Sequence, residues 1–144
     1  MARRTDSPYA MLQVLEKGDR NAKITAARSI KTPIRVLEQL AQDADVTIRS
    51  VVIENPNLPL SSLLELTQDE NVNVRTGLAT HRRNKKVPLE VLEILVNDES
   101  PIVKAQVAVN PDTPIELLSK LALDSSDQVW DALTRNQNTP VEIL

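Results

Sequence analysis

The stretch Thr113–Asn138, TPIELLSKLALDSSDQVWDALTRNQN, has counterparts on both sides along the chain and decides the fold. A proline opens each copy, and successive opening prolines are separated by 25, 26, 29, 26 and 26 residues, at Pro8, Pro33, Pro59, Pro88, Pro114 and Pro140. A sequence period of roughly 20–50 residues is typical of proteins whose similar units stack on one another. The spacing therefore predicts a stacked repeat fold.

Each copy predicts a first helix that begins near its proline. Thr113 precedes Pro114, and Glu116 follows the threonine by three residues. A threonine hydroxyl often caps a helix N-terminus, and a glutamate three residues later completes a capping box. The proline lacks an N–H that the first turn would leave unpaired. We therefore expect the threonine to cap this helix.

The apolar residues of the first helix lie on one face, which we expect to be buried. Two columns of leucines run through the copies on this face: Leu37, Leu63, Leu92 and Leu118, and then Leu40, Leu66, Leu95 and Leu121. The polar segment Asp124–Asp127 favours a turn, and the apolar residues after it predict a second helix. This second helix spans only about two to three turns, so it is expected to be short and either α or 3₁₀.

Two sets of polar residues recur with the period of the fold. Asparagine closes three copies, at Asn55, Asn110 and Asn136, while His81 takes its place in the third copy and is expected to make a turn hydrogen bond. We expect these amides to satisfy helix carbonyls that lack partners. Charged residues form an acidic and a basic column: Asp43, Asp69, Asp98 and Asp124, and Lys23, Arg49, Arg75 and Lys104.

We interpret the charged columns as a structural ladder. The aspartates would cap the second helices or pair with a basic residue of their own or an adjacent copy. Ligand contact is the alternative, which we disfavour because functional sites seldom repeat with the period of a fold. Trp130 replaces the basic residue in the last complete copy. It would cover the open end of the stack or provide an aromatic contact for a partner.

The sequence resembles the leucine-rich repeat variant family, whose repeats carry an N-P-x-T-P-x-E-x-L-x-x-L-A-x-D pattern. The resemblance extends from about Pro8 to Leu144 and is carried best by Asn110–Glu116 with Leu118, Leu121, Ala122 and Asp124. The spacing from Asp43 to Arg49 is also similar to HEAT repeats. The resemblance implies an all-α, right-handed α-solenoid of about five helix pairs with a 26-residue repeat. Some relatives hold an iron–sulfur centre on cysteines, but this chain has none, so we expect no cofactor.

Composition agrees with one domain in a chain of 144 residues, of which 41% are hydrophobic and 1% aromatic. We expect a flexible arm over residues 1–7 and a single solenoid domain over 8–144, with copies starting near 8, 32, 58, 87, 113 and a partial copy from 139. Whether the chain belongs to a longer parent stays open. The sequence has no apolar run long enough for a membrane helix, so a cytoplasmic protein without membrane contact is expected.

The insertion between Pro59 and Pro88 breaks the pattern. Four cations fall within five residues, at Arg82, Arg83, Lys85 and Lys86, in a chain whose net charge is −3. We expect an exposed, projecting loop there, because an insertion must leave a stack whose helices stay in register. The loop is our candidate partner contact together with Trp130, although a merely solvated loop is the competing interpretation.

The residue types exclude several kinds of chemistry. One histidine, two glycines and no cysteine leave no metal motif and no phosphate-binding loop. We therefore expect no enzyme and no small-molecule substrate. The favoured function is non-catalytic binding of another protein through a solenoid surface. The alternative is nucleic-acid binding through Arg82–Lys86, against which stand the scarcity of stacking aromatics and an isoelectric point near 5.2.

Overall fold

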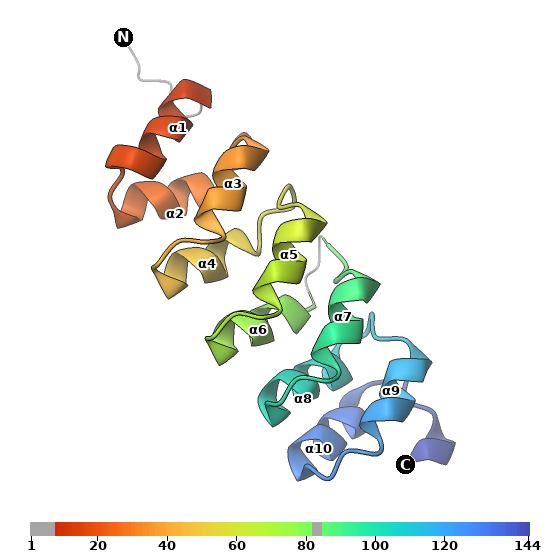
Figure 1. The fold of residues 1–144 in the computed structure, drawn as a ribbon. Helices are drawn as coiled ribbons and strands as arrows, with labels where there is room; N and C mark the ends of the chain where they lie inside the picture. The colour runs from red at the N-terminus through yellow and green to blue at the C-terminus, as the bar shows by residue number, and fades with distance from the viewer. Residues whose placement is uncertain (1–7, 82–84) are drawn as a thin grey trace. The chain divides into compact units, whose positions relative to one another are not determined.

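The structure is a computed structural model that describes residues 8–81 and 85–144. The predicted arm, residues 1–7, and residues 82–84 of the predicted loop lie outside the described residues. Over the described part, the fold is all-α, with ten α-helices, one short 3₁₀ helix and no β-strand (Figure 1). No helix in this part is long and apolar enough to cross a membrane.

The helices alternate between a first and a second helix of each copy. The first helices are α1 (Pro8–Lys17), α3 (Ile34–Leu40), α5 (Leu60–Leu66), α7 (Leu89–Leu95) and α9 (Ile115–Leu121). The second helices are α2 (Arg20–Arg28), α4 (Val46–Val52), α6 (Val72–Ala79), α8 (Pro101–Val109) and α10 (Asp127–Arg135). The 3₁₀ helix η1 (Val141–Ile143) follows α10.

The second helices differ from the sequence expectation. They are α-helices of seven to nine residues, whereas α3, α5, α7 and α9 have seven residues each. The predicted length of two to three turns and the α-helical alternative are therefore confirmed, whereas the expectation that the second helix is the shorter one was wrong in every copy but the first. Each second helix reaches this length because it starts directly after a tight polar turn and continues to the residue that closes its copy. In α8 that residue is Asn110, whose extended backbone ends the helix.

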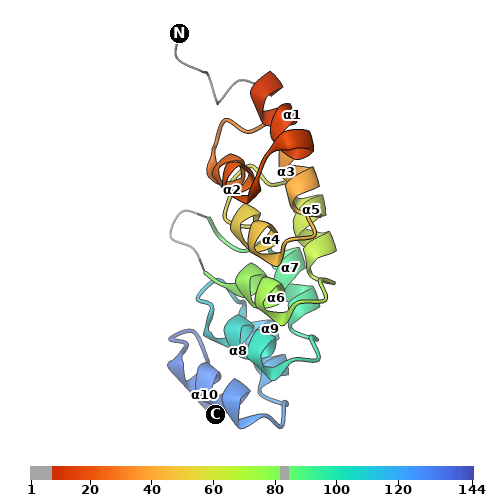
Figure 2. The ribbon, with the colours of Figure 1, turned by 90° about the vertical axis from the view of Figure 1, so that its left-hand side faces the viewer.

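The chain divides into two compact units, Met1–Leu63 and Leu64–Leu144, and the division falls within α5. In the first unit α2 packs against α4, and α1 lies against α2 and α3. In the second unit α6, α8 and α10 pack in series, with α7 and α9 lying against them (Figure 2). The second helices therefore form the continuous packed layer of each unit.

The core consists of aliphatic side chains from both helices of each copy. Both predicted columns of leucines are confirmed, since every one of the eight side chains is at most 5% exposed. The second helices contribute β-branched residues to the same core: Ile48, Val74, Val103 and Val129. Burial of an aliphatic side chain contributes about 1.5–3 kcal/mol, so this core is the main source of stability.

The threonines before the opening prolines do not cap the first helices, which corrects the sequence expectation. Pro114 occupies the N-cap position of α9, and no side chain caps that helix. Thr113 is instead buried, and its Oγ1 donates to the carbonyl of Val107 at 2.7 Å. Thr32 donates to Ala26 in the same way at 2.5 Å. Carbonyls in the last turn of a helix lack intrahelical partners, so they are available to accept a hydrogen bond from the threonine hydroxyl.

Candidate binding surfaces

The closing asparagines tie their copies to the preceding ones. Asn110 Nδ2 donates to the carbonyl of Ala79 at 2.7 Å, while its Oδ1 accepts the N–H of Asp112 at 2.8 Å. Asn136 donates to the carbonyls of Ala108 and Asn110 at 2.8 and 3.0 Å. In the first unit, Asn55 donates to the carbonyls of Ala27 and Ser29. All three amides are buried and lie on helix-end carbonyls, as expected of a structural ladder.

The aspartate column connects neighbouring copies through ion pairs. Asp43 receives a hydrogen bond from Lys23 Nζ at 2.9 Å, and Asp98 receives one from Arg75 Nε at 2.9 Å. Lys104 Nζ pairs with Asp124 in the same manner. In each pair the cation belongs to the copy before that of the aspartate, so these contacts bridge successive copies.

Every aspartate of the column also orders the turn before its second helix. One carboxylate oxygen accepts the backbone N–H two residues later, at 2.8–2.9 Å, in Asp43, Asp69, Asp98 and Asp124. The arginines reach back to the same turns, because Arg49 and Arg75 donate to the carbonyls of Asp43 and Asp69. The turns are therefore held from both sides by side chains of the ladder.

In two aspartates of the column, Asp43 and Asp124, the hydrogen bonds lower the pKa of the carboxyl group. For Asp124, the hydrogen bond from Lys104 is the main cause, followed by the N–H of Ser126. For Asp43, burial is the largest influence and acts to raise the pKa. The hydrogen bonds from the Asp45 N–H and from Lys23 outweigh it, and the pKa is lowered. Both carboxylates are therefore ionised near neutral pH, where they make the ion pairs and hydrogen bonds of the ladder.

Trp130 makes one of the hydrogen bonds that the arginines of the basic column make, to the carbonyl of an aspartate. Its Nε1–H donates to the carbonyl of Asp124 at 2.9 Å, six residues earlier. Arg75 makes the same six-residue contact with Asp69. The indole is half-buried and its polar atom is already used, so a partner could contact only the ring of Trp130.

Only part of the predicted basic loop is described. Arg82 and Arg83 lie outside the described residues, Lys85 is half-buried, and Lys86 is exposed. The projecting loop therefore stays a prediction. His81 contacts the next copy, where its Nδ1 lies 3.1 Å from Asp112 Oδ2.

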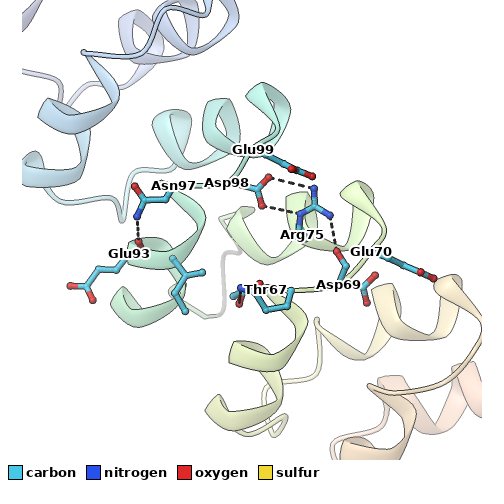
Figure 3. Close-up of a pocket in the computed structure, with 10 residues that line it drawn as sticks. Thr67, Asp69, Glu70, Arg75, Glu93, Asn97, Asp98 and Glu99 are labelled. Atoms are coloured by element: carbon cyan, nitrogen blue, oxygen red, sulfur yellow. Dashed lines mark hydrogen bonds and ion pairs between the residues drawn. The ribbon is translucent and has the colours of Figure 1, made fainter.

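A groove of about 670 Å³ lies in the second unit, between the turn that follows α5 and the turn that follows α7 (Figure 3). Five carboxylates line it, together with one guanidinium: Asp69, Glu70, Glu93, Asp98, Glu99 and Arg75. The guanidinium pairs with Asp98 inside the groove. Three exposed glutamates, at positions 70, 93 and 99, form no ion pair with any residue of the described part. The groove is therefore strongly negative, with Ile94 as its aliphatic contribution.

Each unit carries a row of exposed apolar residues, a feature that the repeat pattern did not predict. Each follows the opening proline of its copy, at Tyr9, Ile34 and Leu60 in the first unit and at Leu89, Ile115 and Val141 in the second. All are at least 40% exposed. The repeated proline–apolar pair is the signal that could have indicated this row, but Ile115 also fits the pattern of a capped helix start.

The comparisons with known proteins give no assignment, since no family model matches the sequence and neither a curated protein nor a solved structure is significantly similar to it. Within residues 8–81 and 85–144, no group of three or more histidine, aspartate or glutamate side chains is placed to hold a metal ion.

Proposed function

We propose that this protein is a non-catalytic protein-binding scaffold, built as a right-handed α-solenoid of about five helix pairs with a 26-residue repeat. The spacing of the opening prolines supports the repeat length. The alternation of first and second helices, and the ladder contacts between successive copies, support the stacking. Membership of the leucine-rich repeat variant family, similarity to HEAT repeats and a cytoplasmic location belong to the same proposal.

The acidic groove is the observation that carries the binding function. Arg75 is already satisfied by Asp98, so it does not neutralise Glu70, Glu93 and Glu99. The carboxylates come from two successive copies, and an extended negative surface of this kind attracts positively charged partners and accelerates their association. We therefore expect the partner to present lysine or arginine side chains together with an aliphatic residue that reaches Ile94.

Nucleic-acid binding through the basic loop is the second candidate. Its support is the run of four cations from Arg82 to Lys86. The groove and the glutamates along the helix starts would repel phosphates, which favours a protein partner. Replacing the four cations with glutamine should reduce the salt dependence of duplex binding by up to about three to four units of log–log slope if the phosphate backbone is bound.

The proposed function can be tested by neutralising the groove. The groove variant carries E70Q, E93Q and E99Q. The matched control replaces three exposed glutamates of the first unit, E16Q, E38Q and E54Q, so both variants gain the same net charge. The parent chain is used as bait for cross-linking and capture from its native source, and each captured protein is then purified.

Association rates of each captured protein with the parent, groove variant and control are measured at low and physiological salt. We expect the groove variant to associate at least about tenfold more slowly at low salt, with little change in the control. Equal rates for the two variants would contradict the assignment of the groove as the binding surface.

A further inference from the structure

The connection between α2 and α3 exposes three cations together with two isoleucines. We call this set the cationic patch, and it consists of Arg28, Ile30, Lys31, Ile34 and Arg35. All five residues are exposed, with Ile30 at 69% and Ile34 at 54%. Arg28 and Arg35 form no ion pair with any side chain in residues 8–81 or 85–144. Both guanidinium groups are therefore available to an acidic partner.

The backbone of this connection is held in place by hydrogen bonds. Asn57 Nδ2 donates to the carbonyl of Ile30 at 2.9 Å, and Asn55 Nδ2 donates to the carbonyl of Ser29 at 2.9 Å. The Lys31 N–H donates to the hydroxyl of Ser29 at 3.2 Å. The cationic patch therefore lies on an ordered backbone, which lowers the entropic cost of binding a partner.

The fold does not require these residue types, as the other copies show. Two copies carry a proline three residues before their opening proline, where this copy carries Ile30, at Pro56 and Pro111. Three copies carry a glutamate where this copy carries Arg35, at Glu90, Glu116 and Glu142. Packing of the repeat therefore does not explain the cations or Ile30, and a partner does.

The acidic groove departs from the repeat in the opposite sense. Glu70 and Glu99 each follow an aspartate of the ladder, a position at which other copies carry Ala44 and Ser125. Both glutamates line the groove beside Ile94, which is 38% exposed (Figure 3). The groove therefore combines negative charge with an aliphatic side chain, whereas the cationic patch combines positive charge with two.

The two units that carry these surfaces have opposite net charges. Residues 1–63 contain nine lysines and arginines and seven aspartates and glutamates, whereas residues 64–144 contain eight and thirteen. The net charges are therefore +2 and −5. Opposite potentials attract two proteins and orient them during their encounter. The first unit of one molecule should therefore be attracted to the second unit of another.

We propose that the cationic patch of one molecule binds the acidic groove of a second copy of this chain. The three cations would face Glu70, Glu93 and Glu99, and the isoleucines would pack on Ile94. The inference rests on the proposed function, because it names the occupant of the same groove. Two different surfaces meet in this contact, so it is heterologous and each molecule can use both surfaces at once.

Other anionic partners fit the cationic patch less well. Single-stranded nucleic acids stack their bases on aromatic side chains, and the patch contains none. Segments that bind anionic membranes carry about four to eight clustered cations, whereas the patch contains three. An acidic protein surface with an exposed aliphatic residue uses both the cations and the isoleucines.

The association should be weak and sensitive to salt. The cationic patch has five residues, whereas one side of a stable interface has about 20–30. Sedimentation velocity of the full chain between about 2 and 200 µM covers the range of transient contacts. At about 20 mM salt the sedimentation coefficient of the parent should rise with concentration, and at about 150 mM it should rise less, because salt screens exposed charges.

Three variants test the pairing of the two surfaces. The patch variant carries R28Q, K31Q and R35Q, and the groove variant carries E70Q, E93Q and E99Q. The control variant carries K17Q, K120Q and R135Q, which replace exposed cations outside the patch and change the net charge by the same amount as the patch variant. Circular dichroism melts verify that all three variants fold.

Mixing the variants gives the most specific result. The patch variant alone and the groove variant alone should each self-associate at least about tenfold more weakly than the parent. An equimolar mixture should regain association, because each variant supplies the surface that the other lacks, and the control should behave like the parent. A parent that stays monomeric at low salt, or a mixture no stronger than its separate components, would overturn the inference.

Two further probes examine the other occupants of the cationic patch. They are vesicles that contain phosphatidylserine and a labelled DNA duplex, each titrated with the parent and the patch variant. Neither probe should bind the patch variant more than about threefold more weakly than the parent. A larger loss on either probe, in a parent that does not self-associate, would assign the patch to lipid or nucleic acid and overturn the inference.

Captured proteins distinguish failure of this inference from failure of the proposed function. If the groove variant slows the association of captured proteins while the parent stays monomeric, the scaffold function stands and this inference fails. If the groove variant changes neither the association of captured proteins nor self-association, both fail.

Discussion

Asparagine suits the copy junctions because one short side chain both donates and accepts hydrogen bonds. In Asn136 the Nδ2 group binds two carbonyls of the preceding copy, and Oδ1 accepts the N–H of Asn138. Aspartate at this position would lack the donor, and leucine would remove the partner of the Ala108 carbonyl and of the Asn138 N–H. The recurrence of asparagine is therefore explained by hydrogen bonding within the fold, without any ligand.

Removing this amide should be costly, and a neighbouring asparagine provides a matched control. Asn136→Ala should reduce the free energy of unfolding by roughly 1–3 kcal/mol, because the Ala108 carbonyl and the Asn138 N–H lose their side-chain partner. Asn138 is exposed and binds the carbonyl of Pro111, so Asn138→Ala should cost less than about 0.5 kcal/mol. Urea denaturation measures both. Equal losses would show that burial of the amide does not matter.

The charged ladder predicts a particular response to acid. The pKa of Asp124 is lowered in the folded state, so its contribution to stability is complete above its ordinary pKa of 3.8 and is lost as the pH falls through the lower folded value. Lys104→Gln removes the main cause of this shift. Stability should therefore depend less on pH below about pH 4 in this variant than in the parent.

Urea denaturation as a function of pH measures this effect. Arg135→Gln is the control, because Arg135 pairs with Asp131 at an exposed position where ion pairs contribute about 0–1 kcal/mol. A pH dependence of Lys104→Gln that matches the parent would mean that the pair with Asp124 does not stabilise the fold.

At the scale of helices, the sequence predicts most where the signal is local. The aliphatic stripe recurs at helical spacing, so the periodicity alone was enough to place the leucine columns in the core. The role of Thr113 could not be predicted in the same way. Its hydroxyl could cap the helix that follows it or donate to a carbonyl at the end of α8. The sequence does not show that the Val107 carbonyl lies within hydrogen-bonding distance, and the fold does.

One helix contains both halves of a test of the core. Leu95 is fully buried in α7, and Leu95→Ala should cost roughly 2–5 kcal/mol of unfolding free energy through lost burial and a residual cavity. Ile94 precedes it on the same helix and is 38% exposed, so Ile94→Ala should cost less than about 1 kcal/mol. Denaturant melts of both variants measure these losses of unfolding free energy. A loss below about 0.5 kcal/mol for Leu95→Ala would be incompatible with the buried column.

At the scale of the whole molecule, the candidate surfaces depend on residues that are distant in sequence. The groove brings Glu70 together with Glu93 and Glu99 from the next copy, and no local pattern indicates that proximity. The doublets Asp69–Glu70 and Asp98–Glu99 are visible in the sequence, but only their aspartates have a ladder role. The glutamates beside them are left for solvent or a partner. Sequence periodicity identifies the residues that recur in each copy. A binding surface instead depends on which residues of successive copies lie side by side in the fold.

Stacking also predicts how stability varies along the second unit. α8 packs between α6 and α10, whereas α8 is the second helix against which α10 packs within the described residues, and Val141 and Leu144 after α10 are largely exposed. The hydroxyl of Thr139 is buried without a hydrogen-bond partner among the described residues, although Thr113 has one at the same place in its copy. Because each copy is stabilised mainly by its neighbours, amides of η1 and α10 should exchange at least about tenfold faster than those of α8.

Hydrogen-exchange mass spectrometry provides the measurement, on a sample shown to be monomeric by sedimentation. The monomer matters because a second molecule packed on η1 would protect the amides of η1 and α10 from exchange. Protection in α10 and η1 equal to that in α8 would show that stability is shared evenly across the unit, and nearest-neighbour stacking would then be the wrong description of it.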